Sequence, residues 1–568
     1  MAENFVLRME EFGGLQISES AGCAIPLGKS PRMLNFKING FGALEKRKGY
    51  RKLFEAPMLL RGFWVGCFGG KEYYLAVVGD TLYASKSGFD TLSPLTGTVP
   101  GGEEKVNFFS FYDGIYLLTG AGIRRFDGEA LSEIQPYVPT VMVATEPNGA
   151  GTVFEEPNLL TPYCKQIFSA TGEHVHFFPF TREIDTVVSV KIDGFDVPND
   201  QYYWDGAYMK LVFLKTPPKG TDNVEVLYRL LREDVSHRIF NCRFAVGFGG
   251  ANDTRVFLYG NPDSPAVRYH SGVVDGKPSF AYFPELGYTL VGSGSPITSI
   301  LRHYDRQLIF TEGAAYYSYL EYMTGESGKL VAAFPVLPLS DDRGCAPKGQ
   351  ALLMENLPCT LTETGLFQWI STNIRDERNA QCFSSSIAHA LQQEKAQEAL
   401  LFFRKATSEL YVCFSGRLYV YHSGMKLFYY YEIPKILDFA EQDTDLYFAT
   451  SQGIFIAEGE SDDGEPIPVY WESGAIPFGD PAREKNVYGV TLFCEGEGGS
   501  KGELSLAEEG SEREVKREIN LSEGKEFSTQ FTRIPLRRLQ LFRIRLESEG
   551  EGALRIRGIR VKGRMIRT

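Results

Sequence analysis

Hydrophobic and polar residues alternate with a period of two in short runs along most of the chain, and clusters of turn-forming residues separate the runs. In the stretch from Arg255 to Phe283, the run Val256–Tyr259 ends at Gly-Asn-Pro-Asp-Ser-Pro, and Val267 opens a second alternating run. Alternation predicts half-buried β-strands, and Gly, Pro, Asn and Asp predict the turns between them. The chain turns again at Asp275-Gly276, ahead of an aromatic run. We therefore predict an antiparallel sheet module of about thirty residues, with looser copies on both sides.

Runs of the same rhythm fill much of the remaining sequence, in units that have room for about four strands each. The units lie at Leu60–Leu95, Lys105–Ile134, Ile297–Tyr319, Ala351–Ile370, Ala399–Tyr431 and Ile436–Ala457. Four short antiparallel strands make one blade of a β-propeller. We predict an all-β protein with a β-propeller of about six to eight blades at its centre. One stretch, Ser384–Leu401, is rich in Ala, Gln, Glu and Leu without Gly or Pro, which predicts a partly helical segment.

The rhythm changes twice, and the changes predict the domain boundaries. From about residue 145 to 232 the alternating runs are longer and denser, so we predict a small β-domain inserted between blades. After an acidic, turn-rich linker near residue 462, the pattern again resembles a sandwich. The predicted divisions are an N-terminal arm at 1–32, propeller parts at 33–144 and 233–460, the inserted β-domain at 145–232, and a C-terminal β-sandwich with basic strands at 461–568.

Composition indicates a folded protein with many strands and turns. The 568 residues include 30 Tyr, 41 Phe, 59 Gly and 29 Pro, which suits short aromatic strands separated by tight turns. The net charge of -13 argues against broad nonspecific binding to duplex DNA. The nine Cys residues show no CxxC spacing, no secretory signal pattern opens the sequence, and no run of about 18 apolar residues occurs. We expect synthesis in a reducing cytosol and no membrane-spanning helix.

A basic stretch near the C-terminus contrasts with the acidic whole. From Arg533 to Arg567 the chain carries eleven Arg or Lys residues and three Glu. On the predicted strands the basic side chains alternate with apolar ones, so one strand face packs and the other presents a basic stripe. We take the following residues as candidate assembly or DNA-facing groups: Arg543, Arg545, Arg555, Arg557, Arg560 and Lys562. The alternative is a solvated edge whose charge only prevents aggregation.

Signals for catalysis or metal binding are weak. His174 and His176 would share one strand face, but no third metal ligand lies nearby in the sequence. The acidic run Glu458–Glu465 lacks the ligand spacing of a calcium loop. Three cysteines precede His389 without a recognisable triad pattern; they are Cys345, Cys359 and Cys382. We therefore predict a protein without enzymatic activity, metal or cofactor.

Several stretches resemble structural proteins of phage and prophage tails that have β-propeller folds. They are GGANDTRVFLYGNPDSPAVRYHSGVVD at 249–275, YFPELGYTLVGSGSPITSILRHYDRQLIFTE at 282–312, and NFKINGFGALEKRKGYRKL at 35–53. The stretch FFPFTREIDTVVSVKIDGFDVPNDQYYWDG at 177–206 resembles small β-domains of tail proteins.

The resemblance implies a tail hub or nozzle in the virion, assembled in the cytoplasm of the bacterial host. The implied partners are other copies of the chain in a ring, with a hexamer as one arrangement, and neighbouring tail or adaptor proteins. The ring would surround the DNA conduit, and DNA would touch it only in passing during ejection. The acidic majority of the chain would keep such a conduit from sticking to DNA.

A second function class stays open, a carbohydrate-binding or glycan-cleaving β-propeller that acts in host-surface recognition. Exposed aromatic side chains on blade loops can stack on sugars. The chain has only four Trp residues, each in a β-rich context where core packing is the expected use: Trp64, Trp204, Trp369 and Trp471. A ring with a central hole would favour the tail protein, whereas a monomer with sugar affinity would favour the glycan-directed propeller.

Overall fold

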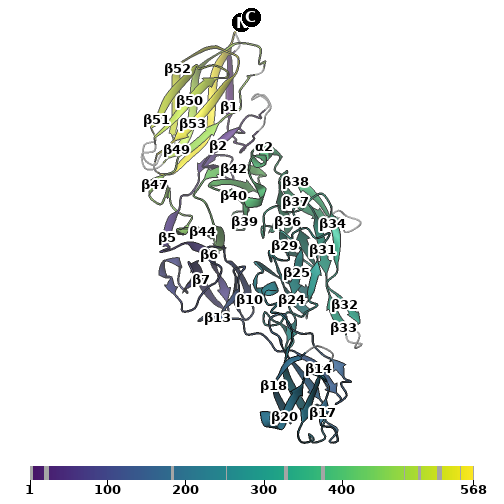
Figure 1. Cartoon of the computed structure of the whole chain (residues 1–568). Coiled ribbons are helices and arrows are strands. Elements are labelled where there is room, and N and C mark those ends of the chain that lie inside the picture. The colour runs from purple at the N-terminus through teal and green to yellow at the C-terminus, as the bar shows by residue number, and fades with distance from the viewer. Residues whose placement is uncertain are drawn as a thin grey trace.

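The computed structural model describes residues 4–17, 25–180, 184–250, 253–324, 330–371, 378–478, 480–496, 501–520, 527–550 and 552–566. In this part of the chain nearly all regular structure is β-strand, arranged in many small sheets (Figure 1). The helical pieces are single turns: α1 (His237–Phe240), α2 (Ala388–Gln392) and the 3-10 turns η2 (Phe89–Thr91), η3 (Asn199–Gln201), η4 (Ser385–Ile387) and η5 (Ala396–Glu398). None of the helices described is long and apolar enough to cross a membrane. The all-β class and the partly helical stretch 384–401 are therefore confirmed.

Six sheets of the described chain share one form, four antiparallel strands that pair in chain order. The first two are β6 (Leu60–Phe68), β7 (Lys71–Val78), β8 (Thr81–Ser85) with β9 (Ser93–Pro94), and β10 (Asn107–Phe111), β11 (Gly114–Leu118), β12 (Ile123–Phe126) with β13 (Leu131–Glu133). The next two are β23 (Phe244–Gly250), β24 (Asp253–Tyr259), β25 (Val267–His270) with β28 (Tyr288–Leu290), and β29 (Ser299–His303), β30 (Arg306–Phe310), β31 (Ala315–Tyr319) with β34 (Val336–Ser340). The last two are β35 (Leu352–Met354), β36 (Leu357–Thr362), β37 (Gly365–Ser371) with β38 (Arg378–Cys382), and β39 (Leu400–Arg404), β40 (Glu409–Phe414), β41 (Arg417–His422) with β42 (Leu427–Glu432).

A seventh four-stranded sheet joins distant parts of the chain. It contains β43 (Asp438–Gln442), β44 (Asp445–Thr450), β45 (Gly453–Ile456) and, as its fourth strand, β5 (Arg51–Glu55). β5 lies antiparallel to β45, with Phe54 opposite Ile454. An early strand, placed just before the first of the six sheets, therefore completes the last sheet of this central series.

The first sheet of the central series packs between two neighbouring sheets. On β7, Tyr74, Ala76 and Val78 pack against the sheet of β44 and β45. Leu75 and Val77 point the other way, against the sheet of β10 and β11. Successive side chains of a strand point to opposite faces, and here both faces are apolar and covered.

The first strands of the sheets contact one another in succession. The contacts are β6 with β10, β10 with β23, β23 with β29, β35 with β39, β39 with β43, and β43 with β6. Between β29 and β35, the amide of Ala351 donates a hydrogen bond to Ser299 Oγ at 3.0 Å. The sheet of β43 therefore contacts both the sheet of β39 and the first sheet of the series, that of β6.

Residues 140–230 form a unit with its own core at one end of the molecule (Figure 1). A larger sheet has the order β15-β14-β16-β22-β18-β19, and a smaller sheet has the order β17-β21-β20. The strands are β14 (Thr140–Thr145), β15 (Thr152–Val153), β16 (Tyr163–Phe168), β17 (His176–Phe177), β18 (Ile184–Ile192), β19 (Phe195–Asp196), β20 (Tyr202–Asp205), β21 (Lys210–Phe213) and β22 (Val224–Leu230). Phe168 of the larger sheet meets Phe177 of the smaller one, with ring centroids 5.4 Å apart.

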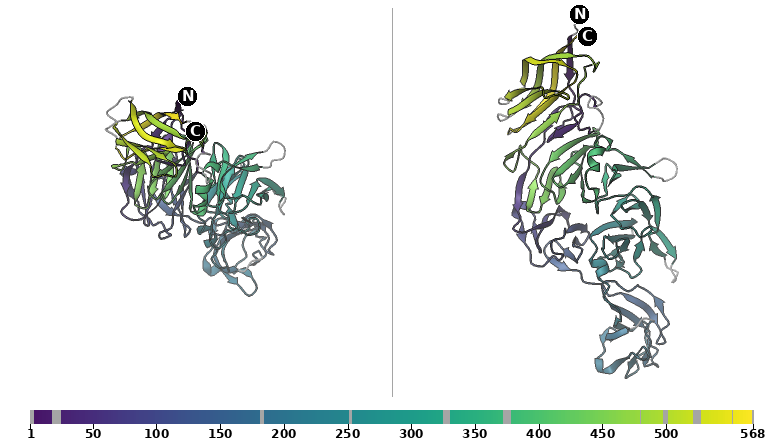
Figure 2. Two further views of the ribbon diagram at one scale, coloured as in Figure 1. Left: turned by 90° about the horizontal axis from the view of Figure 1, so that it is seen from above. Right: turned by 45° about the horizontal axis from the view of Figure 1, so that its top comes forward.

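The two ends of the chain together build two facing sheets, which we call the terminal sheet pair (Figure 2). The first sheet contains β1 (Asn4–Met9), β3 (Phe36–Ile38), β4 (Leu44–Lys46), β49 (Lys485–Gly496), β52 (Phe527–Leu539) and β54 (Leu554–Met565). The second contains β2 (Arg32–Leu34), β48 (Val469–Glu472), β50 (Lys501–Glu508), β51 (Glu514–Asn520) and β53 (Phe542–Ser548). Ile556 of the first sheet and Leu546 of the second are buried in one common core.

The N-terminal strands of this pair differ from the predicted division, which placed residues from 33 onward with the propeller. β2 pairs with β48, and β4 pairs with β54, so these strands belong with the C-terminal part of the chain. The alternating pattern predicts that strands form here. It contains no information on their partners, because the hydrogen-bonded neighbours lie at the other end of the sequence.

The aromatic run after Asp275-Gly276 is not a strand, which corrects the prediction. Its place is taken by the hairpin β26 (Val273–Val274) and β27 (Lys277–Pro278) and by the turn at 279–283. Asn158 holds this turn, because it donates to the carbonyl of Ala281 at 2.7 Å and accepts from the amide of Phe283 at 3.0 Å. The side-chain amide replaces the ladder partners that a strand would have.

Candidate functional site

The candidate basic residues of β53 lie on the outer face of one terminal sheet. Ile544 points into the core, so Arg543 and Arg545 on either side of it point outward. Both guanidiniums bind Glu472, at 3.1 and 3.4 Å. Each also has a second carboxylate partner; these are Glu509 for Arg543 and Glu514 for Arg545.

The candidate arginines of β54 lie on the outer face of the other terminal sheet and are also paired within the chain. Arg555 binds Glu45 at 3.0 Å and Glu495 at 3.2 Å. Its hydrogen bond to Glu45 raises the pKa of Arg555 above the ordinary value. Arg557 shares Glu495 with it. Two carboxylates from different strands therefore face these two arginines.

Toward the end of β54 the positive charge is less compensated. Arg560 reaches Glu10 at 3.3 Å. Lys562, Arg564 and, on the neighbouring strand β1, Arg8 are exposed, and none of the three has an ion-pair partner among the residues that the structure describes. Val6 lies opposite Lys562 in the β1–β54 register, so Arg8 and Lys562 are diagonal neighbours. We call Arg8, Lys562 and Arg564 the free cation cluster.

The candidate basic residues do not form a single stripe. β53 and β54 belong to different sheets that face each other across one core, so their outward side chains lie on opposite sides of the terminal sheet pair. Alternation correctly predicts that these arginines point away from the core. It does not show that two consecutive strands lie in different sheets, and the role of the residues in assembly or DNA contact stays a prediction.

A two-stranded ribbon between β31 and β34 exposes apolar side chains. It consists of β32 (Glu321–Thr324) and β33 (Leu330–Ala333), and we call it the arm (Figure 1). The exposed fractions are 53% for Tyr322, 57% for Met323, 71% for Leu330 and 53% for Val331. Met323 lies opposite Val331, and no other described strand pairs with the arm. Both faces of the outer part of the ribbon are therefore exposed, and no described strand covers its edges.

The histidine and acidic motifs do not converge on a metal site within the described residues, where no cluster of three or more His, Cys, Asp or Glu side chains is arranged for one. The ring of His174 lies 2.8 Å from the hydroxyl of Thr171. The acidic run at 458–465 is not an open linker, which corrects the prediction. It contains the hairpin β46 (Ser461–Asp462) and β47 (Glu465–Pro466), where Asp462 accepts two hydrogen bonds from Arg47 at 2.8 and 2.6 Å.

Two of the three cysteines that precede His389 are buried in hydrophobic clusters. Cys345 and Cys359 are fully buried, and burial raises the pKa of Cys345 to about 12. Such thiols stay protonated at neutral pH and are poor nucleophiles. Cys382 is exposed and free.

Most of the Trp side chains pack in hydrophobic clusters, as expected. Trp369 and Trp471 are 1% and 0% exposed. Trp64 and Trp204 are partly buried against hydrophobic clusters of their own sheets. In the described structure, none of the four offers a fully exposed ring for stacking on a sugar.

A cavity of about 480 Å³ lies where the first strands of the central series begin. Its lining comes from the starts of β10, β23, β29, β35, β39 and β43 and includes Lys105, Arg243, Ile297, Lys348, Leu400 and Leu437. Lys105 binds Asp438 at 2.7 Å, and Arg243 binds Glu104 at 2.7 Å. No sequence motif indicates this cavity, because each sheet supplies only one or a few of its residues.

Comparisons with known proteins show no family for this chain. No protein-family model and no curated protein matches the chain. Among solved structures, the chain is similar to PorZ, an essential bacterial surface component of the type-IX secretion system of Porphyromonas gingivalis, at 13% identity and a TM-score of 0.32. That similarity covers 79% of this chain and 44% of PorZ, so the chain spans less than half the length of that structure. It is also similar to the extracellular domain of a putative one component system from B. thetaiotaomicron, at 12% identity and a TM-score of 0.22, over 96% of this chain and 98% of that one.

Proposed function

We propose that the chain is a non-enzymatic structural component of a phage or prophage-derived tail, of the hub or nozzle type. The sequence resemblance at 35–53, 249–275 and 282–312 supports this proposal. Copies of the chain would form a ring in the virion, around the DNA conduit, and would dock neighbouring tail or adaptor proteins. The arm is the structural observation that carries the assembly role.

Within this proposal, we infer that the central series is a β-propeller of seven blades. The succession of contacts among the first strands and the completion of the last sheet by β5 support a closed ring of sheets. The unit at 140–230 would then be a domain inserted after the second blade. The terminal sheet pair would be a β-sandwich shared by the two chain ends.

The arm argues for a protein partner on physical grounds. A lone two-stranded ribbon is marginally stable in water, and its open edges are ready to pair with another chain. The fixed base of the arm, where Ala332 packs beside buried Phe334, Phe248 and Phe257, sets its direction. We infer that the arm of one copy docks on the next copy in a ring, because a contact between two different surfaces of identical chains closes into a ring when the rotation allows.

Replacing Met323 and Val331 by Asp tests this role. The two side chains form one cross-strand pair on the arm, so two carboxylates there oppose burial in any interface. We expect the wild type to form a ring in solution, seen as a multiple of the 63.6 kDa chain mass and as rings by electron microscopy. We expect the Met323→Asp, Val331→Asp variant to be folded and at least about tenfold weaker in assembly.

Leu286→Asp serves as the matched control, because Leu286 is 70% exposed on a loop elsewhere. It should leave the assembly unchanged. A wild-type chain that stays monomeric at high concentration, or an arm variant that assembles as well as the control, would contradict the proposal.

Two exposed tyrosines on the inserted unit favour a second candidate, binding of surface glycans. Tyr203 and Tyr208 are 52% and 71% exposed near the end of β20. Tyrosine rings of this kind can stack on sugars. A monomeric chain with sugar affinity would support this candidate instead of the tail protein.

A further inference from the structure

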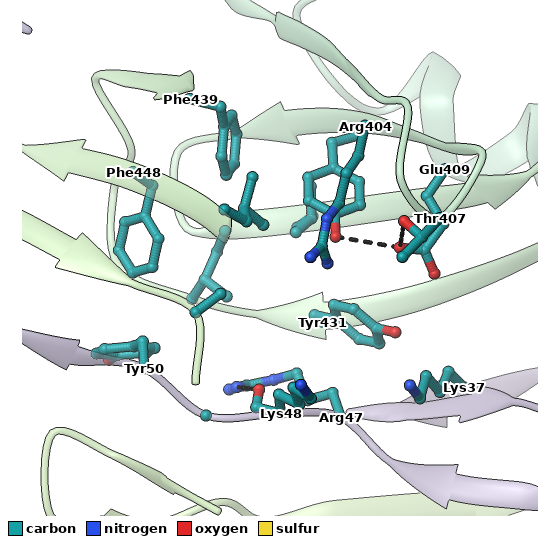
Figure 3. A pocket seen from close by; sticks show the side chains of 16 residues that line it. Lys37, Arg47, Lys48, Tyr50, Arg404, Thr407, Glu409, Tyr431, Phe439 and Phe448 are labelled. Atoms are coloured by element: carbon teal, nitrogen blue, oxygen red, sulfur yellow. Dashed lines mark hydrogen bonds between the residues drawn. The ribbon is translucent and has the colours of Figure 1, made fainter. Parts of the chain in front are cut away.

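A second cavity lies between two neighbouring sheets and a crossing segment of the chain (Figure 3). It has a volume of about 330 Å³. One wall comes from the sheet of β39 to β42, another from β43 to β45, and residues 47–50, which join β4 to β5, lie along a third side. Protein interiors leave few voids larger than a water molecule, and pockets for small ligands begin at about 300 Å³. The cavity is therefore large enough for a small molecule.

Aromatic rings line one side of this cavity. Tyr411 meets Phe439 with ring centroids 5.5 Å apart and an interplanar angle of 72°. Tyr50 meets Phe448 at 5.2 Å and 86°. All four side chains line the cavity, and the labelled rings of Phe439, Phe448 and Tyr50 follow one another along it in Figure 3. An array of this kind provides flat apolar surface for a planar group.

Arg404 brings a cation to the cavity beside Tyr411. Its Nη2 donates to the carbonyl of Thr444 at 2.9 Å. Its Nε is buried and has no hydrogen-bond partner, and it forms an ion pair with Glu441, whose nearest oxygen is 3.6 Å away. In Figure 3 the guanidinium points into the cavity. An arginine with free N–H groups in such a position favours an anionic group as its partner.

The other charges of the lining also favour an anion. Lys48 is exposed and has no ion-pair partner among the described residues, whereas Arg47 is held by Asp462. The one carboxylate of the lining is Glu409, which accepts hydrogen bonds from the hydroxyls of Thr407 at 2.7 Å and Tyr411 at 3.2 Å. These donors satisfy Glu409 from its own sheet. Arg404, beyond its ion pair with Glu441, and Lys48 can still donate to a bound anion.

We propose that this cavity binds a small amphipathic anion, an aromatic ring that carries a carboxylate. The ring lies against Phe439 and Phe448, and the carboxylate lies near Arg404 and Lys48. The same chemistry occurs in free aromatic acids and in the C-terminal aromatic residue of a peptide. This site does not depend on the assembly role proposed above.

Calorimetric titration with 3-phenylpropionate tests the site, with 3-phenylpropanol and phenethylamine as matched probes. We expect the acid to bind at least about tenfold more tightly than the alcohol, and the amine to bind more weakly than the alcohol, because Arg404 and Lys48 attract the carboxylate and repel the ammonium group. Arg404→Gln and, separately, Lys48→Gln should each reduce the affinity for the acid about threefold to tenfold and leave the affinity for the alcohol unchanged. Lys71→Gln, at the exposed start of β7 in another sheet, should change neither.

Two peptides distinguish the sources of the ligand. Acetyl-Gly-Gly-Phe with a free carboxylate should compete with 3-phenylpropionate if the cavity accepts a chain end, and its amide should not; competition by neither peptide assigns the cavity to free acids. Equal binding of acid, alcohol and amine would overturn the proposal, as would the absence of binding by the acid to the folded wild type. Lys48→Gln keeps the test decisive if Arg404→Gln fails to fold.

Discussion

At the residue scale, Arg268 and His270 show that the polar positions of an alternating strand can be buried when neighbouring sheets cover both faces of its sheet. The pattern on β25 predicts a half-buried strand, with these two polar residues on the open face. Arg268 is instead 0% exposed and donates to Ser318 at 2.9 Å and to the carbonyl of Phe334 at 2.7 Å. Burial lowers its pKa to about 9. The polar face is covered because the next sheet packs on it, and only neutral acceptors satisfy the guanidinium.

His270 should make the protein sensitive to acid. Burial, together with the smaller effects of the charges of Arg268 and Arg255, lowers its pKa from 6.5 to about 3. The folded state therefore binds its proton only near pH 3, whereas the unfolded state binds it near pH 6.5, so stability falls as the pH decreases through this interval. We expect His270→Phe to lose less thermal stability than the wild type between pH 6.5 and 4, measured by circular dichroism. Equal losses in both proteins would contradict this assignment.

At the element scale, sequence predicts where strands form better than it predicts their partners. The run at Leu60–Leu95 predicts strands that the structure places at β6, β7 and β8, because local alternation and Gly turns determine them. The pairing of β5 with β45 and of β4 with β54 has no local signal. The same limit applies to the candidate arginines: their outward direction follows from alternation, but Glu45 and Glu472, which neutralise Arg555 and Arg543, lie far away in the sequence. The cavity of Figure 3 has no motif for the same reason.

The joint between β5 and β45 can be tested at Gly453. A Cβ atom there would lie 2.4 Å from the carbonyl oxygen of Phe54, which is backbone and part of the ladder. Gly453→Val should therefore displace β5 and lower the free energy of unfolding by about 1–3 kcal/mol. Thermal melting and hydrogen exchange of the β5 amides measure the effect. Gly40→Ala is the control, because a Cβ at Gly40 meets nothing within 4 Å. If the melting temperature and the hydrogen exchange of Gly453→Val were unchanged, β5 would not pack closely against β45.

At the scale of the whole molecule, most of the basic charge near the C-terminus is neutralised by ion pairs within the terminal sheet pair. Arg555 and Arg557 share Glu495, and Arg543 and Arg545 share Glu472. Among the described residues, the free cation cluster of Arg8, Lys562 and Arg564 stays available to a partner, at the end where both termini lie. On a chain of net charge -13, such a cluster can attract the acidic surface of another copy.

Charge reversal at two positions of this cluster separates assembly from folding. Lys562→Glu with Arg564→Glu removes no ion pair among the described residues, so its stability should stay within about 0.5 kcal/mol of the wild type. We expect weaker ring assembly in sedimentation, with the largest difference from the wild type at low salt, because the Debye length grows from about 10 Å at 0.1 M salt to about 30 Å at 0.01 M. The matched variant is Arg555→Glu with Arg557→Glu, which places two new carboxylates beside Glu45 and Glu495 and should lower the melting temperature itself. Unchanged assembly of the Lys562, Arg564 variant at both salt concentrations would leave the cluster with a role in solubility alone.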